Sequence, residues 1–184
     1  AQAYADSTIR LAKKLKDTKT LWLGLNSKAE ALRIGGDLEG AMKIHQVALE
    51  IAEANKFNIK IAHSLNNIGL VLKRQANFKS AAEYINKAKD VYASLHDSDG
   101  MITAYNNLGN CVYNIKEYDK AFEYYNAAIQ IANARNDNYS LGNAYTNIAH
   151  CYYEQNQKIK AKEYYLIGMQ YREKTGNASD LADS

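Results

Sequence analysis

The side chains that most often do chemistry in proteins are scattered in this sequence. Its four histidines are His45, His63, His96 and His150. They share no common spacing, and no His-x-x-x-His pair occurs that would join two of them on a helix face. Gly35-Gly36 is not followed by the lysine and serine of a phosphate-binding loop. We therefore predict that the chain is not an enzyme and holds no metal or cofactor.

Two other residue types recur at one fixed spacing. Cys111 and Cys151 are separated by it, and the corresponding earlier positions hold Ala31 and Val71, so we expect small buried residues and no disulfide. Asparagine recurs in the same way, at Asn67, Asn107 and Asn147. Asparagine is unfavourable inside a helix, because its side chain competes for backbone hydrogen bonds. Its recurrence at mid-helix positions therefore requires a reason.

The composition excludes several classes of protein. Hydrophobic residues make up 47% and charged residues 23%, and the net charge of +3 comes from basic residues interspersed with acidic ones. This pattern does not favour nucleic-acid binding. No apolar run is long enough to span a membrane, and the N-terminus lacks the layout of a secretory signal. The compartment stays open, with a lean toward the cytoplasm.

The same 40-residue spacing extends to the whole chain. Alanine stands at Ala41, Ala81, Ala121 and Ala161, and a second set of small residues is Ala29, Gly69, Gly109 and Ala149. Within each repeat the apolar residues follow the period of two amphipathic helices joined by a short turn. The absence of proline lets one helix follow another without interruption. We predict an all-α, helix-turn-helix repeat solenoid.

The repeat resembles the tetratricopeptide repeat, whose pattern combines Leu-Gly, aromatic residues and alanines at fixed positions. The third repeat matches it best, with Tyr105, Leu108, Gly109, Tyr118, Ala121, Tyr125 and Ala128. The first repeat departs from it, because Lys28 stands in the leucine column and His45 in the aromatic one. The long period is similar to that of scaffold proteins of the spindle-orienting and kinesin-light-chain kind and of peptide-sensing bacterial regulators. The resemblance implies a right-handed superhelix whose first helices line a concave, peptide-binding groove.

These columns give the expected domain organisation. Residues 1–184 form one solenoid segment, with repeats at 21–60, 61–100, 101–140 and 141–180. Residues 1–16 fall in the columns of the second helix of a preceding repeat, and residues 181–184 begin a further helix. We therefore expect a segment of a longer array, because neither end has the polar character of a capping repeat.

The resemblance also says which side chains to expect in the groove. They are Asn66, Asn67, Leu70, Lys73, Asn106, Asn107, Asn110, Tyr113, Asn143, Asn147, His150 and Tyr153. Amides can pair with the N–H and C=O groups of a bound peptide. Alternatively, Asn67, Asn107 and Asn147 bond to one another or to a neighbouring helix and only set the stacking of the repeats. Lys73, with Arg33, Arg74 and His63, could add a small basic patch that favours an acidic segment.

Two functions fit these observations. The first is a scaffold or adaptor that binds a protein or peptide in the groove, without nucleic acid, membrane or cofactor. The alternative is the peptide-sensing regulatory domain of a larger bacterial regulator or signalling protein. A clamp for a C-terminal carboxylate is disfavoured, because the corresponding columns, His63, Thr103 and Asn143, lack the basic pair.

Overall fold

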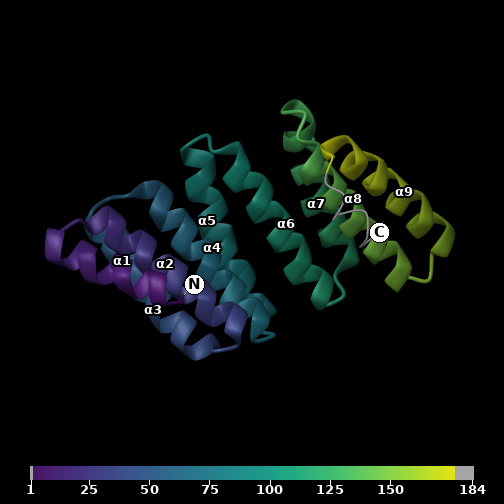
Figure 1. Ribbon diagram of the computed structural model, residues 1–184. Helices are drawn as coiled ribbons and strands as arrows, with labels where there is room; N and C mark the ends of the chain where they lie inside the picture. Colours follow the sequence, from purple (N-terminus) through teal and green to yellow (C-terminus); the bar gives the residue numbers. More distant parts are fainter. Residues whose placement is uncertain (1, 177–184) are drawn as a thin grey trace. The chain divides into compact units, whose positions relative to one another are not determined.

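The structure, a computed structural model, describes residues 2–176, which form nine α-helices (Figure 1). The helices are α1 (Gln2–Leu15), α2 (Thr18–Gly35), α3 (Leu38–Ala54), α4 (Asn58–Arg74), α5 (Phe78–Ser94), α6 (Ser98–Asn114), α7 (Tyr118–Ala134), α8 (Asn138–Glu154) and α9 (Lys158–Thr175). They belong to two compact units, unit 1 (Ala1–His96) with α1 to α5 and unit 2 (Asp97–Ser184) with α6 to α9. The further helix expected at 181–184 lies outside the described residues, as does Ala1.

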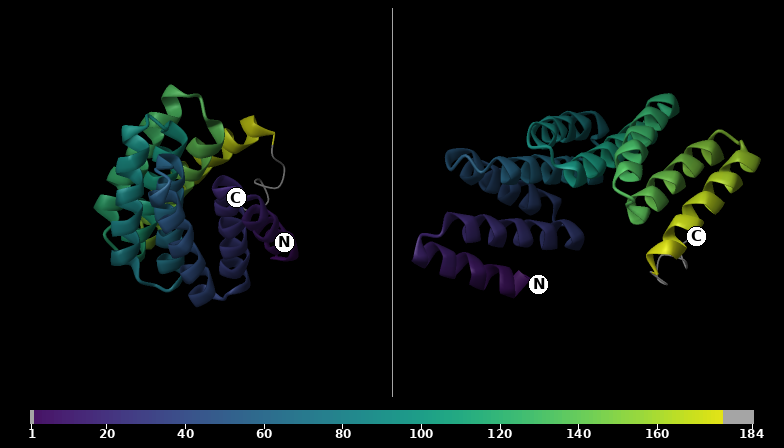
Figure 2. Two further views of the ribbon diagram at one scale, coloured as in Figure 1. Left: turned by 90° about the vertical axis from the view of Figure 1, so that its left-hand side faces the viewer. Right: turned by 90° about the horizontal axis from the view of Figure 1, so that it is seen from above.

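The helices alternate in the manner of a repeat solenoid, which confirms the predicted fold class. The first helices of the four repeats begin at Thr18, Asn58, Ser98 and Asn138, in step with the 40-residue period. Each start lies slightly before the positions 21, 61, 101 and 141 that the columns suggested. Consecutive helices within a repeat lie side by side and run in opposite directions (Figures 1 and 2). First helices also contact each other, α2 with α4 and α6 with α8.

All the connections between helices use one turn. A residue with positive φ follows each helix, at every twentieth position: Lys16, Gly36, Lys56, Ala76, His96, Lys116, Asn136, Asn156 and Gly176. In most of these turns the next N–H bonds back to the carbonyl five residues earlier, as from Asn77 to Leu72 at 2.9 Å. This is the Schellman motif, and its last residue is also the N-cap of the next helix. Asp17, Asp37, Asn77, Asp97 and Asp137 then cap that helix through their side chains.

The left-handed turn gives a prediction at Ala76. With φ of 58°, its methyl group is strained against the backbone, whereas glycine adopts this conformation freely. We expect Ala76→Gly to raise the free energy of unfolding by up to about 1 kcal/mol, measured by urea denaturation. Ala54→Gly, at an exposed helix end, is the control and should not raise the free energy of unfolding. A loss of stability in Ala76→Gly would contradict the assigned turn.

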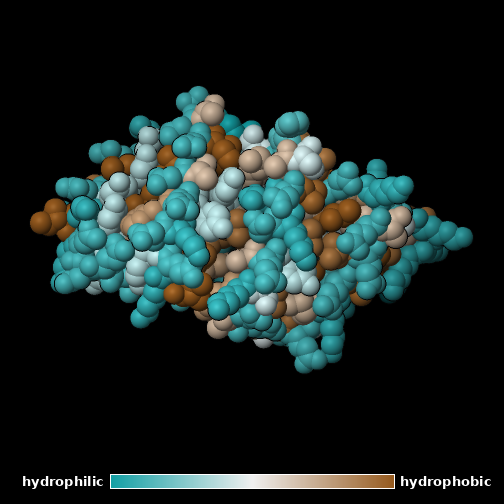
Figure 3. All heavy atoms as spheres, turned by 180° about the vertical axis from the view of Figure 1, so that it is seen from behind, coloured by the Kyte–Doolittle hydropathy of each residue, from teal (hydrophilic) through white to brown (hydrophobic). Residues whose placement is uncertain are grey.

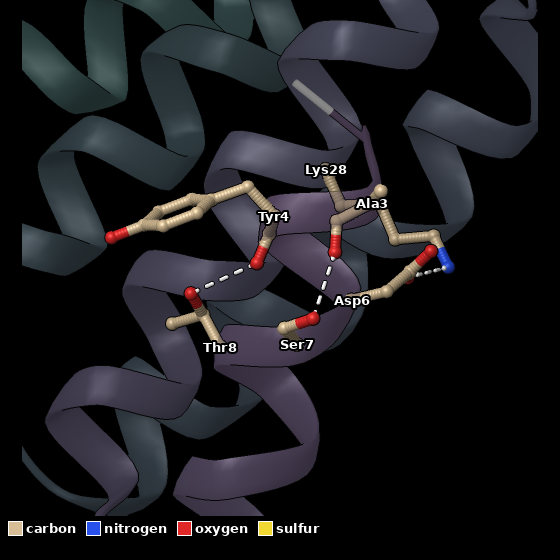
Figure 4. Close-up of polar contacts among 6 residues, drawn as sticks. All are labelled: Ala3, Tyr4, Asp6, Ser7, Thr8 and Lys28. Atoms are coloured by element: carbon tan, nitrogen blue, oxygen red, sulfur yellow. Dashed lines mark hydrogen bonds and ion pairs between the residues drawn. The ribbon is translucent and has the colours of Figure 1, made fainter.

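Unit 1 explains the departure of the first repeat from the pattern. Lys28 stands where the other repeats have buried Ile68, Leu108 and Ile148. Its ammonium group pairs with the Asp6 carboxylate of α1 at 2.7 Å (Figure 4), so α1 and α2 are joined by an ion pair at this position. Figure 4 also shows Ser7 and Thr8 donating to carbonyls one turn earlier within α1.

The core of each unit has its own character. In unit 1 the buried Trp22 packs with Ala48 and Ala52, and its indole N–H donates to Ser64 at 2.9 Å. In unit 2 the core around Tyr125 is surrounded by tyrosines. On the face shown in Figure 3, hydrophobic residues reach the surface in patches between hydrophilic ones. Within residues 2–176, no helix combines the length and apolar character needed to cross a membrane.

Candidate amide-lined binding site

The predicted amides of unit 2 come together around a cavity between α6 and α8. The cavity has a volume of about 310 Å³. Its lining from α6 and α8 consists of Ile102, Thr103, Asn106, Asn107, Asn110, Tyr139, Ser140, Asn143 and Asn147. Arg172 of α9 completes it. Five of the predicted groove residues therefore lie on one wall, which carries no acidic side chain from the described part of the chain.

A second cavity continues this wall. It has a volume of about 250 Å³ and shares Asn110 and Asn147 with the first. Its remaining lining is Tyr113, Asn114, Tyr125 and His150. His150 and Tyr153 also line a third cavity between α8 and α9, of about 540 Å³. The eight site residues predicted in unit 2 thus all line adjoining cavities.

One atom of this wall has no partner. The side-chain oxygen of Asn106 is buried and accepts no hydrogen bond from the described residues. A buried acceptor left unsatisfied costs about 1–3 kcal/mol. Unit 1 has two amides in the same column, Asn26 and Asn66. Of these, Asn26 accepts a hydrogen bond from the Asn67 NH2 group at 2.7 Å. The amides therefore join adjacent repeats in unit 1, whereas in unit 2 an acceptor stays open beside a cavity.

The groove residues predicted in unit 1 are less available. Asn66 is only 6% exposed, because α4 packs against α2, α3 and α5, so it does not project from the helix as expected. Leu70 and Lys73 are half-buried. The predicted basic patch is also weaker, because the Arg33 guanidinium group is bound by both oxygens of the Glu30 carboxylate.

Second-helix tyrosines form hydrogen bonds with side chains of this wall. The buried Tyr125 hydroxyl donates to the Asn110 oxygen at 2.8 Å, and burial raises the pKa of this tyrosine. One repeat later the Tyr165 hydroxyl lies 3.0 Å from His150 Nδ1. Burial, and then the charge of Arg172, lower the pKa of His150, while Glu154 opposes them. His150 is therefore held toward its neutral form, able to accept or donate a hydrogen bond.

Reactive chemistry is not supported by the remaining groups. Cys111 and Cys151 are buried and unbonded to each other, as predicted. Burial raises the pKa of the Cys151 thiol to about 12, so it is not a reactive thiolate at neutral pH. Among residues 2–176, no three histidine, cysteine or acidic side chains gather in a way that could hold a metal ion.

Comparison with known families supports the repeat pattern. Two tetratricopeptide-repeat models match, one over residues 61–99 and the other over residues 100–166, so together they span more than half of the chain without a gap. The chain belongs to the tetratricopeptide-repeat family. Proteins of this family are generally scaffolds for protein interactions and not enzymes. No curated protein sequence is significantly similar to the chain.

Solved structures of this tetratricopeptide-repeat fold are similar at low sequence identity. BtubC (BKLC) from P. vanneervenii has a TM-score of 0.81 and 21% identity, over 96% of this chain and 74% of that chain. Aspartyl phosphate phosphatase F from Bacillus subtilis has a TM-score of 0.78 and 21% identity, over 89% of this chain and 46% of that chain. The tetratricopeptide-repeat domain of Arabidopsis FLU has a TM-score of 0.57 and 23% identity, over 61% of this chain and 95% of that chain. At these identities the likeness concerns the fold.

Among the residues of the tetratricopeptide-repeat cavities that were not predicted from the sequence are Arg172 and Tyr165. Arg172, 9% exposed, lies on a second helix, whereas first helices were expected to line the groove. Its alkyl chain lies close to Gly142 of α8, so the absence of a side chain at Gly142 leaves room for it. Tyr165, also on a second helix, lines the third cavity. The signal was present at Gly142, a glycine in mid-helix with no turn to explain it.

Proposed function

We propose that the chain is a scaffold that binds an extended peptide segment of a partner protein along the α6 and α8 amides. The observation that carries this proposal is the buried oxygen of Asn106, an acceptor without a partner that lies beside a cavity. A peptide N–H that donates to this oxygen would remove the cost of leaving it unsatisfied. Binding would therefore gain free energy from an interaction that the unbound chain cannot make.

The rest of the wall suits a peptide backbone. Asn143 and Asn147 each offer a donor and an acceptor, which match the alternating C=O and N–H groups of an extended chain. Arg172 adds a positive charge at the wall and favours a ligand without a nearby cation. The peptide-sensing alternative would use the same wall but couple it to an output domain, and no contact in the described residues favours it.

The test compares amides that look alike in sequence but differ in their partners. A peptide is first selected from a random library against the wild-type chain, and its affinity is then measured by fluorescence anisotropy. We expect Asn106→Ala and Asn147→Ala each to weaken binding about tenfold, the effect of one lost hydrogen bond in a buried site. Helicity, measured by circular dichroism, should not change.

Asn67→Ala provides the matched control. It breaks the bond to Asn26, so we expect it to lower the free energy of unfolding by about 1 kcal/mol and to leave the affinity unchanged. Asn106→Ala should instead stabilise the unbound chain slightly, because it removes an unsatisfied acceptor. Equal affinity in the wild type and in both α6 and α8 variants would reject the proposed site.

A further inference from the structure

The cavity between α8 and α9 differs from the amide wall in its chemistry. It has a volume of about 540 Å³, and its lining includes the apolar side chains of Ala161, Leu166 and Met169. Lys158 and Lys162 of α9 stand at its rim. Among residues 2–176, no acidic residue lines it, and neither lysine takes part in a described ion pair.

The two lysines stand where every earlier repeat has an apolar residue. The position of Lys158 is held by Leu38, Phe78 and Tyr118, and that of Lys162 by Met42, Ala82 and Phe122. In unit 2 the Phe122 ring packs against Tyr152 of α8, with ring centroids 4.8 Å apart. The column of Lys162 therefore faces the first helix of the following repeat, whereas Tyr118, in the column of Lys158, packs against Tyr113 of its own repeat. In α9 both columns hold a positive charge in place of an apolar residue.

The remaining apolar residues of this face are incompletely covered. Tyr125 and Ile129 are 1% and 7% exposed under the cover of α8, whereas Tyr165 and Met169, one repeat later, are half-buried. The surface of α7 against which α8 packs thus has an equivalent on α9, where it is an open, partly apolar cavity with lysines at its rim. Its geometry is that of a helix seat, because its counterpart in the preceding repeat holds a helix.

We propose that the α8–α9 cavity binds an acidic amphipathic helix from a partner protein. Its apolar side chains would lie on Leu166 and Met169, and its carboxylates would pair with Lys158 and Lys162. A helix without carboxylates would fit poorly, because it would partly bury the ammonium groups of Lys158 and Lys162 without an acidic partner. Carboxylates remove this cost, and charge complementarity gives the site its selectivity. This proposal does not depend on the amide wall.

The test uses two synthetic helical peptides of the same 18-residue length as α9. Both carry one stripe of leucines, flanked by glutamates in the first peptide and by lysines in the second. With the full chain, fluorescence anisotropy should show at least about tenfold tighter binding of the acidic peptide, and a loss of this preference as salt is raised. Equal binding of the two peptides would overturn the proposal.

Charge reversal locates the site. We expect Lys158→Glu/Lys162→Glu to weaken binding of the acidic peptide at least about tenfold and to strengthen binding of the basic peptide. Lys13→Glu/Lys14→Glu, on exposed positions of α1, changes the net charge equally and should have no such effect. Asn106→Ala should also leave this binding unchanged, so failure here and failure of the amide site are distinguishable. If the α9 variant binds like the wild type, the proposal is wrong.

Two other occupants give different results. If a second copy covers the cavity, sedimentation should show self-association that Lys158→Glu/Lys162→Glu abolishes. If a following segment of the gene product covers it, Met169 should resist oxidation by peroxide in the full-length protein without any partner. Either outcome would overturn the proposal. Ready oxidation of Met169 in the unbound protein, and protection by the acidic peptide, would support it.

Discussion

Replacing His45 by leucine should stabilise the protein and change how its stability depends on pH. His45 is fully buried, and neither ring nitrogen has a hydrogen-bond partner among the described residues. Burial lowers its pKa from 6.5 to about 4; the nearby Glu30 carboxylate has a smaller effect that raises the pKa, and the Arg33 guanidinium group has a smaller effect that lowers it. Removing two unsatisfied polar atoms should add about 1–3 kcal/mol to the free energy of unfolding at neutral pH.

The pH dependence follows from the lowered pKa. Above pH 6.5 the imidazole is neutral in both the folded and the unfolded state, so it costs nothing extra. As the pH falls from 6.5 toward 4, the unfolded chain takes up a proton that the folded chain excludes, and about 3 kcal/mol of stability is lost. His45→Leu should abolish this loss. The Glu30 carboxylate, whose pKa is lowered chiefly by its hydrogen bond from Arg33, contributes a separate loss at still lower pH.

Urea denaturation at neutral pH and near pH 4.5, followed by circular dichroism, measures both effects. Leucine is chosen over isoleucine because the register places the Ala29 methyl group against residue 45. Ile85, the equivalent residue one repeat later, faces Gly69 instead. A Cβ added at Gly69 would lie only 2.5 Å from Cγ1 of Ile85, so the isoleucine fits only because glycine has no side chain. Ile85→Leu is the repacking control and should keep the wild-type pH profile. Parallel pH profiles in wild type and His45→Leu would contradict the assignment.

Substituting Gly109 by alanine should be the most damaging small change in unit 2. A Cβ on Gly109 would lie 2.4 Å from Cε1 of Tyr125, which is fully buried. The ring has nowhere to move, because α8 covers it and its hydroxyl is bound to Asn110. Overpacking of this kind costs about 1–3 kcal/mol, although alanine is the better helix former.

A double-mutant cycle separates the clash from other effects. Tyr125→Leu removes the ring and leaves a cavity, so it destabilises the protein by itself. In the double variant Gly109→Ala/Tyr125→Leu, the new methyl group occupies part of that space, and the two losses should be less than additive. Gly35→Ala, where a new Cβ would have no atom within 4 Å, should not destabilise the protein. Additive losses in the cycle would show that the two residues do not compete for space.

The sequence could predict the fold because a single spacing repeats through the chain. Small residues at Gly69 and Gly109, and apolar residues in the same columns of each repeat, were sufficient to place the helices and their order. The register also brought the amides of α6 and α8 to one wall. It could not tell Asn106 from Asn26, since both occupy the same column and differ only in whether a neighbour donates a hydrogen bond.

What the register missed depends on packing between side chains. Asn66 is buried although its column points away from the apolar face, because three helices surround α4. Arg172 reaches the amide cavity only because Gly142 opposite it has no side chain. The exposure of Tyr165 reflects the absence of a covering helix among the described residues. Such features depend on which side chains of neighbouring helices are in contact. The position of a residue in the repeat does not contain that information.

The uniform turn has a consequence for how such a chain could change its length. A left-handed residue closes a helix at every twentieth position, from Lys16 to Gly176, so any two of these turns are interchangeable as joints. Deleting a single helix with its turn would rejoin the backbone smoothly but would place a second-type helix where a first-type helix belongs. Deleting or duplicating a whole repeat restores both the joint and the helix type. Gene rearrangements in this lineage should therefore survive in whole multiples of the repeat, with odd half-repeats eliminated by misfolding.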